Sequence, residues 1–186
     1  MKYEIKSIIN GLVLYTAELP DDTHSGMKMF AALEQAVARK ADLRNVKLCG
    51  ADLRNVNLCG ANLGNADLSG ADLRNAKLCG ADLSYAILGN ADLSGADLHG
   101  AYLGGADLCG ANLDGEKLTK TPIMIQNLNW DILITDHYMR IGCQRHTHAD
   151  WEAFDDHTIV AMDRQALRFW RQWREPLLVM CEAHVD

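Results

Sequence analysis

Two groups of cysteine and histidine residues have the spacing that metal or redox chemistry would need. Cys143, His146 and His148 lie within six residues, and thiolate sulfur and imidazole nitrogen are ligands that Zn²⁺ prefers. Their Cys-x2-His-x-His spacing is not a standard zinc pattern. Two interpretations therefore remain open, a metal site or a buried cysteine followed by histidines at a helix start. We expect the second, and so predict no metal.

The second group comprises Cys59, Cys79 and His99, which are twenty residues apart. If residues twenty apart stack in a column, two such thiols can meet the Cα separation of a disulfide or, with an imidazole, act as metal ligands. However, side chains in one column point in parallel, and no fourth ligand is evident. Since no export signal precedes the chain, we expect all six cysteines to be reduced thiols in a cytosol.

No other group of residues has the pattern of a catalytic site. The sequence contains no recognisable set of nucleophile, base and orienting residue. The run from Gly110 to Lys117 has the glycine spacing of a phosphate-binding loop, but Glu116 stands where that loop needs lysine. We therefore predict that the chain is not an enzyme and needs no cofactor.

A short repeat must position all of these side chains, because it fills the chain from Ala41 to Lys120 without a break. These 80 residues form sixteen units of five, and every unit has leucine at its third position. The first position is nearly always alanine, the second is mostly Asp or Asn, and the last two are small or polar. An apolar period of five fits neither a helix nor a strand. The repeat therefore predicts a solenoid, in which each unit buries its apolar face against its neighbours.

The unit Ala-Asp-Leu-x-x resembles the repeat of the pentapeptide-repeat family, and the match covers 80 of the 186 residues. The resemblance implies an all-β solenoid, a right-handed quadrilateral β-helix with four units per coil. It also implies that each alanine and leucine points inward and that the other three positions face solvent. Sixteen units then make about four coils, and the repeat is a rod roughly 20 Å long at the usual strand spacing.

The sequence divides into a cap over residues 1–40, the repeat domain over 41–125 and a C-terminal hairpin and helical module over 126–186. This order resembles that of phage and prophage pentapeptide-repeat proteins. The run from Ile141 to His146, followed by Trp151, resembles a tail that recurs in such proteins. The resemblance implies a phage or prophage protein in the cytoplasm of a bacterial or phage-infected cell.

The N-terminal segment is predicted to be a β-hairpin followed by a helix that covers the open end of the solenoid. Asn10-Gly11 lies between two β-rich runs and is a strong hairpin signal, because both turn residues must adopt positive φ. The helix should have about 15 residues. Its N-cap candidates are Asp21, Asp22 and Thr23.

The C-terminal module is predicted to begin with a hairpin that turns at Asp136-His137. Thr147 and Asp150 have the spacing of a capping box at the start of a short helix.

A longer helix begins near Asp156 and carries Trp170 and Trp173 on its apolar face. Pro176 should kink or restart this helix. Two alternatives remain open for the apolar face: a homodimer through this helix, or docking on the end of the solenoid.

One outward column of the repeat is acidic and contains Asp52, Asp72 and Asp92. An acidic column can imitate the phosphates of DNA, which is the proposed logic of family members that bind type II topoisomerases. The repeat has ten acidic and seven basic residues, a net charge of −3, whereas a 20 Å length of duplex carries about 12 negative charges. Arg54 and Arg74 also lie within reach. We therefore expect a solvated, salt-bridged face, with DNA mimicry as the alternative.

Three apolar residues interrupt the small and polar outward pattern, and they should lie near one another on the later coils: Tyr85, Ile87 and Tyr102. An exposed apolar cluster marks a contact surface. The alternatives are packing against the C-terminal module and binding to an external partner.

The composition argues against two further classes of function, nucleic-acid binding and membrane spanning. A net charge of −7 argues against direct binding to nucleic acid, and no apolar run approaches the ~20 residues of a membrane span. A core filled by leucine and alanine has no cavity for a substrate. We predict a non-catalytic, rigid scaffold for interaction with an unidentified protein. The alternative is a DNA-mimic inhibitor or protector of a DNA-acting enzyme, either DNA gyrase or another topoisomerase, or a host defence nuclease.

Overall fold

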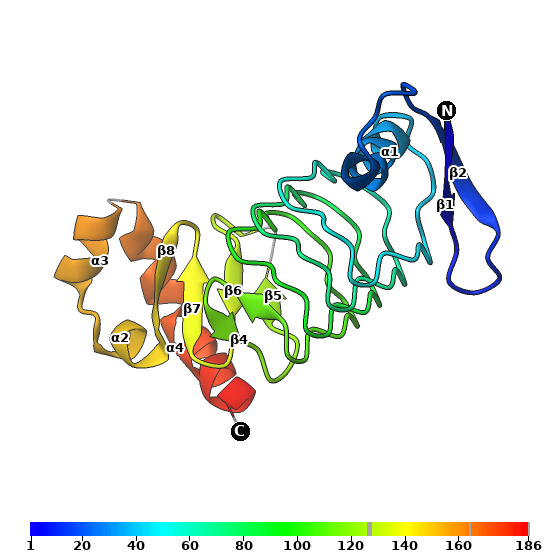
Figure 1. Ribbon diagram of the computed structural model, residues 1–186. Helices are drawn as coiled ribbons and strands as arrows, with labels where there is room; N and C mark the ends of the chain where they lie inside the picture. The colour runs from blue at the N-terminus through cyan, green and yellow to red at the C-terminus, as the bar shows by residue number, and fades with distance from the viewer. Residues whose placement is uncertain (126–127, 164, 186) are drawn as a thin grey trace. The chain divides into compact units, whose positions relative to one another are not determined.

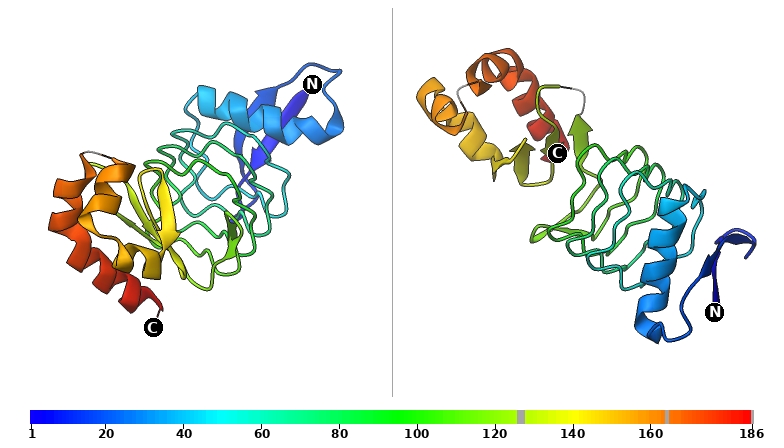
Figure 2. Two further views of the ribbon diagram at one scale, coloured as in Figure 1. Left: turned by 90° about the vertical axis from the view of Figure 1, so that its left-hand side faces the viewer. Right: turned by 90° about the horizontal axis from the view of Figure 1, so that it is seen from above.

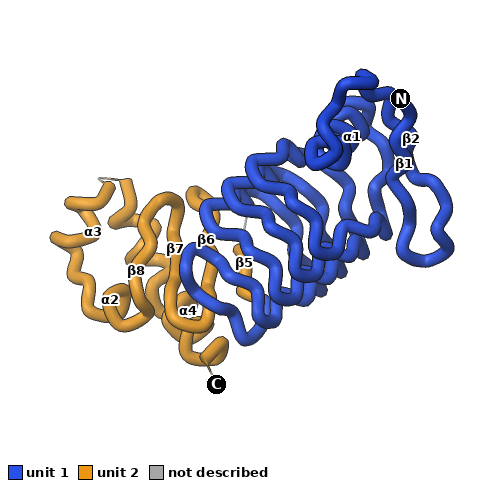
Figure 3. The backbone as a smooth tube through the Cα atoms, viewed as in Figure 1, with its two compact units in different colours: residues 1–121 blue, residues 122–186 orange. Residues whose placement is uncertain are grey.

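The computed structural model describes residues 1–125, 128–163 and 165–185. They form two compact units, Met1–Thr121 and Pro122–Asp186 (Figure 1, Figure 3). The boundary between the units therefore lies between Thr121 and Pro122, whereas the sequence placed the end of the repeat domain at residue 125.

The first unit opens with an antiparallel pair, β1 (Lys2–Lys6) and β2 (Val13–Glu18). Gly11 adopts the expected positive φ of 69°, but Asn10 does not. The Asn10 side chain instead accepts a hydrogen bond from the Leu12 N–H at 3.0 Å. The hairpin is present, but its turn is longer than the two-residue turn that the Asn-Gly pair predicts.

The helix α1 (Lys28–Ala38) has 11 residues, fewer than the 15 expected, and follows a 3₁₀ turn, η1 (Ser25–Met27). No side chain caps α1. Asp21 is engaged by the N-terminal amine at 2.6 Å, and the Thr23 hydroxyl donates to the Pro20 carbonyl at 2.8 Å. The predicted caps are thus used to close the preceding loop, and α1 begins later.

The repeat residues wind into stacked coils (Figure 1, Figure 2). Parallel bridges join residues twenty apart, such as Asp52 with Asp72, so that four five-residue units make one coil. Backbone hydrogen bonds run from each coil to the next, as from the Leu48 N–H to the Asp67 carbonyl at 2.8 Å. All sixteen leucines are buried, and among the inward alanines and valines only Ala41 and Ala51 are partly exposed. The inward register of the repeat is therefore confirmed.

The fourth coil does not close as the sequence predicted. The last parallel bridge of the repeat joins Asp92 to Asn112. Two short strands, β3 (Asn112–Leu113) and β4 (Glu116–Lys117), then pair antiparallel, and the Leu118 N–H donates to the Ala111 carbonyl at 2.8 Å. The final unit folds back at the point where glutamate replaces the usual alanine.

The second unit contains a four-stranded antiparallel sheet in the order β5 (Ile123–Ile125), β6 (Ile132–Ile134), β7 (Tyr138–Ile141) and β8 (Gln144–Thr147). The pairing of β6 with β7 confirms the predicted hairpin. Strands β5 and β8 were not predicted, because their short runs lack a clear alternation of apolar and polar residues.

The described part of the second unit also contains three helices: α2 (His148–Ala153), α3 (Asp156–Met162) and α4 (Ala166–Val185). The capping box is confirmed, since the Thr147 hydroxyl accepts from the Asp150 N–H and the Asp150 carboxylate accepts from the Thr147 N–H, each at 3.1 Å. The predicted long helix is two helices, and Pro176 lies inside α4 without ending it. None of the helices in the described ranges is long and apolar enough to cross a membrane.

Candidate interaction surfaces

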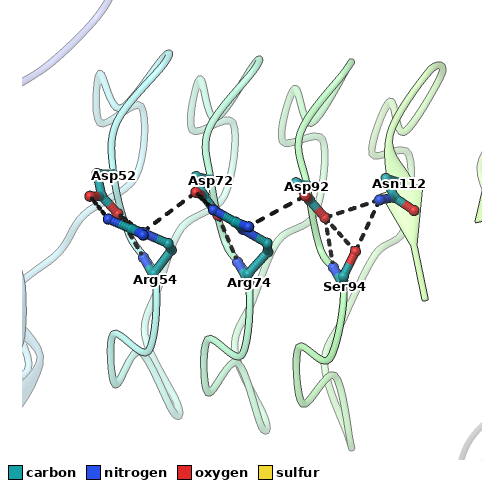
Figure 4. A network of polar contacts seen from close by, with 7 residues as sticks. All are labelled: Asp52, Arg54, Asp72, Arg74, Asp92, Ser94 and Asn112. Atoms are coloured by element: carbon teal, nitrogen blue, oxygen red, sulfur yellow. Dashed lines mark hydrogen bonds and ion pairs between the residues drawn. The ribbon is translucent and has the colours of Figure 1, made fainter. Parts of the chain in front are cut away.

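The acidic column forms a ladder of alternating charges, which we call the Asp–Arg ladder (Figure 4). Arg54 pairs with Asp52 of its own coil at 2.6 Å and reaches Asp72 of the next coil at 3.5 Å. Arg74 repeats this pattern with Asp72 at 2.7 Å and Asp92 at 3.8 Å. Each arginine therefore contacts carboxylates of two coils.

The ladder ends in neutral partners. Asp92 accepts hydrogen bonds from the Ser94 hydroxyl at 2.5 Å and from the Asn112 side-chain amide at 3.2 Å (Figure 4). Hydrogen bonds from the Arg54 guanidinium lower the pKa of Asp52 to about 2, and those from Arg74 lower the pKa of Asp72. The two arginines thus favour the ionised form of Asp52 and Asp72 and compensate much of the negative charge of this face.

The three predicted apolar residues are all exposed, Tyr85 to 67%, Ile87 to 43% and Tyr102 to 58%, and we call them the aromatic patch. Tyr85 lies in the turn between the face that carries Tyr102 and the face that carries Ile87. The bridges from Asp82 to Tyr102 and from Ile87 to Asp107 place the patch on the third and fourth coils. The patch therefore surrounds one corner of the solenoid, on different faces from the ladder.

Tyr85 has an unusual backbone for its residue type. Its φ is 58°, in the left-handed region, which costs an ordinary L-residue about 1–2 kcal/mol. The fifth position of the first fifteen units has positive φ throughout, and every one of the other fourteen residues is asparagine or glycine. Among these fifteen positions, only Tyr85 is neither asparagine nor glycine, and its aromatic side chain faces solvent.

The cysteine column departs from the expectation of six reduced thiols. Cys59 and Cys79 form a disulfide whose Cα atoms are 4.6 Å apart. The reason is the coil period of twenty residues, which brings the two Cα atoms within disulfide range. Cys49, Cys109 and Cys143 are free and exposed.

The Cys143, His146 and His148 group is not arranged as a metal centre. Within the described residues, no three His, Cys, Asp or Glu side chains are placed to hold a metal ion. The His146 ring packs edge-on against Trp151 and Phe154, with ring centroids 5.2 and 4.9 Å apart. Aromatic packing therefore explains His146 without a ligand role.

The two tryptophans of the predicted apolar helix face, for which the sequence leaves open a homodimer or docking on the solenoid, pack against other residues of the second unit. Trp170 is buried and packs on Trp151 with ring centroids 5.3 Å apart, and Trp173 is half-buried beside Phe169. The apolar stripe of α4 is therefore largely used within its own unit, and we do not count Trp170 as a surface residue.

The second unit has two hollows lined by described residues. One is a cavity of about 70 Å³ lined by Trp130, Trp151 and Phe169 among others, too small for most substrates. The other is an open groove of about 620 Å³ between α2 and α4, which Cys181 lines. Burial raises the pKa of that thiol to about 11, so it stays protonated at neutral pH.

The profile of pentapeptide repeats matches residues 29–65, 50–84 and 76–115 with eight copies, beginning inside α1 and continuing through most of the coils. The chain belongs to the pentapeptide-repeat family. Members of this family form right-handed quadrilateral β-helices and are generally not enzymes. The coil of four units in this pentapeptide-repeat protein agrees with that architecture.

Several pentapeptide-repeat proteins of known structure resemble parts of the chain. HetL from Nostoc sp. strain PCC 7120, described as involved in heterocyst differentiation regulation, is 41% identical over 41% of this chain and 42% of its own, with a TM-score of 0.19. Rfr23 from Cyanothece 51142 is 35% identical over 37% of this chain and 40% of its own, with a TM-score of 0.21.

A third protein, alr5209 from Nostoc PCC 7120, is 41% identical over 43% of this chain and 74% of its own, with a TM-score of 0.26. This chain thus spans about two fifths of the length of HetL and Rfr23. The similarity covers less than half of the chain, and no curated protein matches it.

Proposed function

We propose that this pentapeptide-repeat protein is a non-catalytic scaffold that binds a protein partner through outward side chains of its coils. The aromatic patch carries this proposal, because it places three exposed apolar side chains on a repeat whose other outward positions are small or polar. The core agrees with this proposal, because buried leucine and alanine side chains fill the inward positions of the coils.

DNA mimicry is the weaker alternative for this chain. A mimic needs an uncompensated row of negative charge, whereas the Asp–Arg ladder pairs its aspartates with Arg54 and Arg74. The phage or prophage origin, the cytoplasmic location and the homodimer remain predictions from the sequence.

Site-specific photocrosslinking tests the scaffold function. Benzoylphenylalanine in place of Tyr102 should yield a discrete protein adduct in extracts of the cell that expresses the chain. The matched control places the same group at Asp97, which is also an exposed second position of a unit but lies on another face. Equal adducts from both positions, or none from position 102, would contradict the proposal.

A further inference from the structure

We propose that the aromatic patch, together with three carboxylates beside it, recognises a protein segment in which arginine or lysine residues flank an aliphatic or aromatic side chain. This inference rests on the proposed scaffold function and adds the chemistry of the partner.

The three carboxylates lie in the same columns as the patch. Parallel bridges place Asp67 and Asp107 on either side of Ile87, and another places Asp82 beside Tyr102. The apolar centre of this corner is therefore bordered by acidic side chains on both of its faces.

Unlike those of the ladder, these carboxylates form no ion pair with a lysine or arginine of the described residues. Lys47 lies beside Asp67 in its column, and the charge of Arg44 helps to lower the pKa of Asp82. Asp67 accepts from the Ser69 hydroxyl at 2.5 Å, Asp82 from the Ser84 N–H at 2.9 Å, and Asp107 from the Cys109 N–H at 3.0 Å.

Their hydrogen-bond donors are neutral and belong to the same turn. The negative charge of Asp107 therefore remains available to a partner, and those of Asp67 and Asp82, near Lys47 and Arg44, remain so in part. Charges that are complementary across an interface steer association and select the partner. A basic segment is therefore the ligand that this corner fits, and an acidic one is excluded.

The surface beside Tyr85 is bare backbone. A Cβ atom on Gly105 would lie 2.5 Å from the Tyr85 ring, so the ring rests directly on that glycine. A Cβ atom on Gly104 would meet nothing within 4 Å. A partner's chain can therefore approach the ring closely, and a side chain added at Gly104 would obstruct it without disturbing the coil.

The conformation of Tyr85 agrees with a binding role. Strained backbone positions persist where they serve a function, and asparagine would satisfy this turn without strain, as it does at Asn65 and Asn75. Replacing Tyr85 by asparagine should therefore spare folding and remove binding.

The experiment uses three fluorescein-labelled peptides and the whole chain. The first alternates arginine and leucine, the second has glutamate in place of arginine, and the third has serine in place of leucine. Fluorescence anisotropy at about 0.15 M salt should show the first peptide binding at least tenfold more tightly than either of the others, because both its charge and its apolar side chains are needed.

Four variants locate the binding. Tyr85→Asn, Gly104→Arg and Asp107→Asn should each weaken binding of the arginine–leucine peptide at least fivefold. The matched control, Asp52→Asn, also removes one carboxylate, but from the ladder, and should change the affinity less than twofold. Thermal unfolding of Tyr85→Asn should stay within roughly 4 °C of the parent chain, so that lost binding is not lost folding.

Several outcomes would overturn the proposal: no binding of the arginine–leucine peptide, equal binding of the glutamate peptide, or equal effects of Asp52→Asn and Asp107→Asn. Sedimentation that shows a dimer dissociated by Tyr85→Asn would make a second copy the occupant and would also overturn it. A specific crosslink at position 102 without peptide binding would leave the scaffold function intact and refute only the basic partner.

Discussion

Leu78→Ala tests the central physical claim about the coils, that each leucine stabilises them from inside. Leu78 is fully buried, and Leu58 and Leu98 occupy the same inward column in the coils on either side. The substitution removes three carbon atoms, worth about 0.8 kcal/mol each, or about 2.5 kcal/mol. The cavity adds to this loss, because hydrogen bonds of 2.8 Å to both neighbouring coils hold the backbone in place. We expect a total loss of about 3–4 kcal/mol.

The loss should appear as a fall of roughly 10 °C in the midpoint of thermal unfolding. Far-UV circular dichroism is the signal to follow for the coils. Tryptophan fluorescence does not report on them, because all four tryptophans lie in the second unit.

The neighbouring residue provides the control. Lys77 is exposed, and Lys77→Ala should change the free energy of unfolding by less than about 0.5 kcal/mol. If Leu78→Ala cost less than about 1 kcal/mol, or no more than Lys77→Ala, the inward register of the repeat would be refuted.

Three further changes test other contacts. Cys59→Ser, or reduction with dithiothreitol, should lower the free energy of unfolding by roughly 3 kcal/mol in chemical denaturation, because the bond to Cys79 closes a loop of twenty residues in the unfolded chain. The control Cys109→Ser should leave the free energy of unfolding unchanged, and equal effects of the two substitutions would argue against the cross-link. In an NMR titration the Asp52 carboxyl should have a pKa of about 2, so that its contribution to stability is complete above about pH 4 and is lost as the pH falls toward 2; a midpoint at the ordinary value of 3.8 would contradict the ion pair. Thr147→Ala should cost about 1 kcal/mol in the unfolding of the second unit followed by tryptophan fluorescence, since α2 loses its cap, and an unchanged midpoint would show that the cap contributes nothing.

The periodic part of the fold could be predicted because one rule repeats sixteen times. Leucines at equivalent positions, such as Leu78, have equivalent neighbours in each coil, so their burial follows from the repeat period alone. The end of the repeat could not be predicted in this way, because Glu116 interrupts the pattern once and its effect on the last coil depends on the chain that follows. The start of α1 was missed for a similar reason, since Asp21 prefers the distant N-terminal amine over a local cap.

The candidate surfaces, too, could be predicted only where they follow from the repeat. The members of the Asp–Arg ladder and of the aromatic patch could be listed from the twenty-residue columns. The contacts and the backbone conformation of each residue could not be predicted from the sequence. Only the structure shows that Arg54 bridges two coils and that Tyr85 occupies a turn suited to asparagine. It also shows that no lysine or arginine in the described ranges forms an ion pair with Asp67 or Asp107. Trp170 lies outside any such column, and tertiary packing decides its burial.

Because bridged residues are twenty apart, the position of an outward residue within the repeat determines the face of the solenoid on which it lies. One extra five-residue unit inserted after Gly80 would keep each later leucine inside, yet it would turn all later outward residues by a quarter of a coil. Tyr102 would then leave its column. Four extra units would return it to the same face, one coil further along. The number of inserted units therefore decides which face of the solenoid carries a given outward residue. Insertions of whole units can rotate a binding surface, copy it or separate it from another without altering the composition of the core.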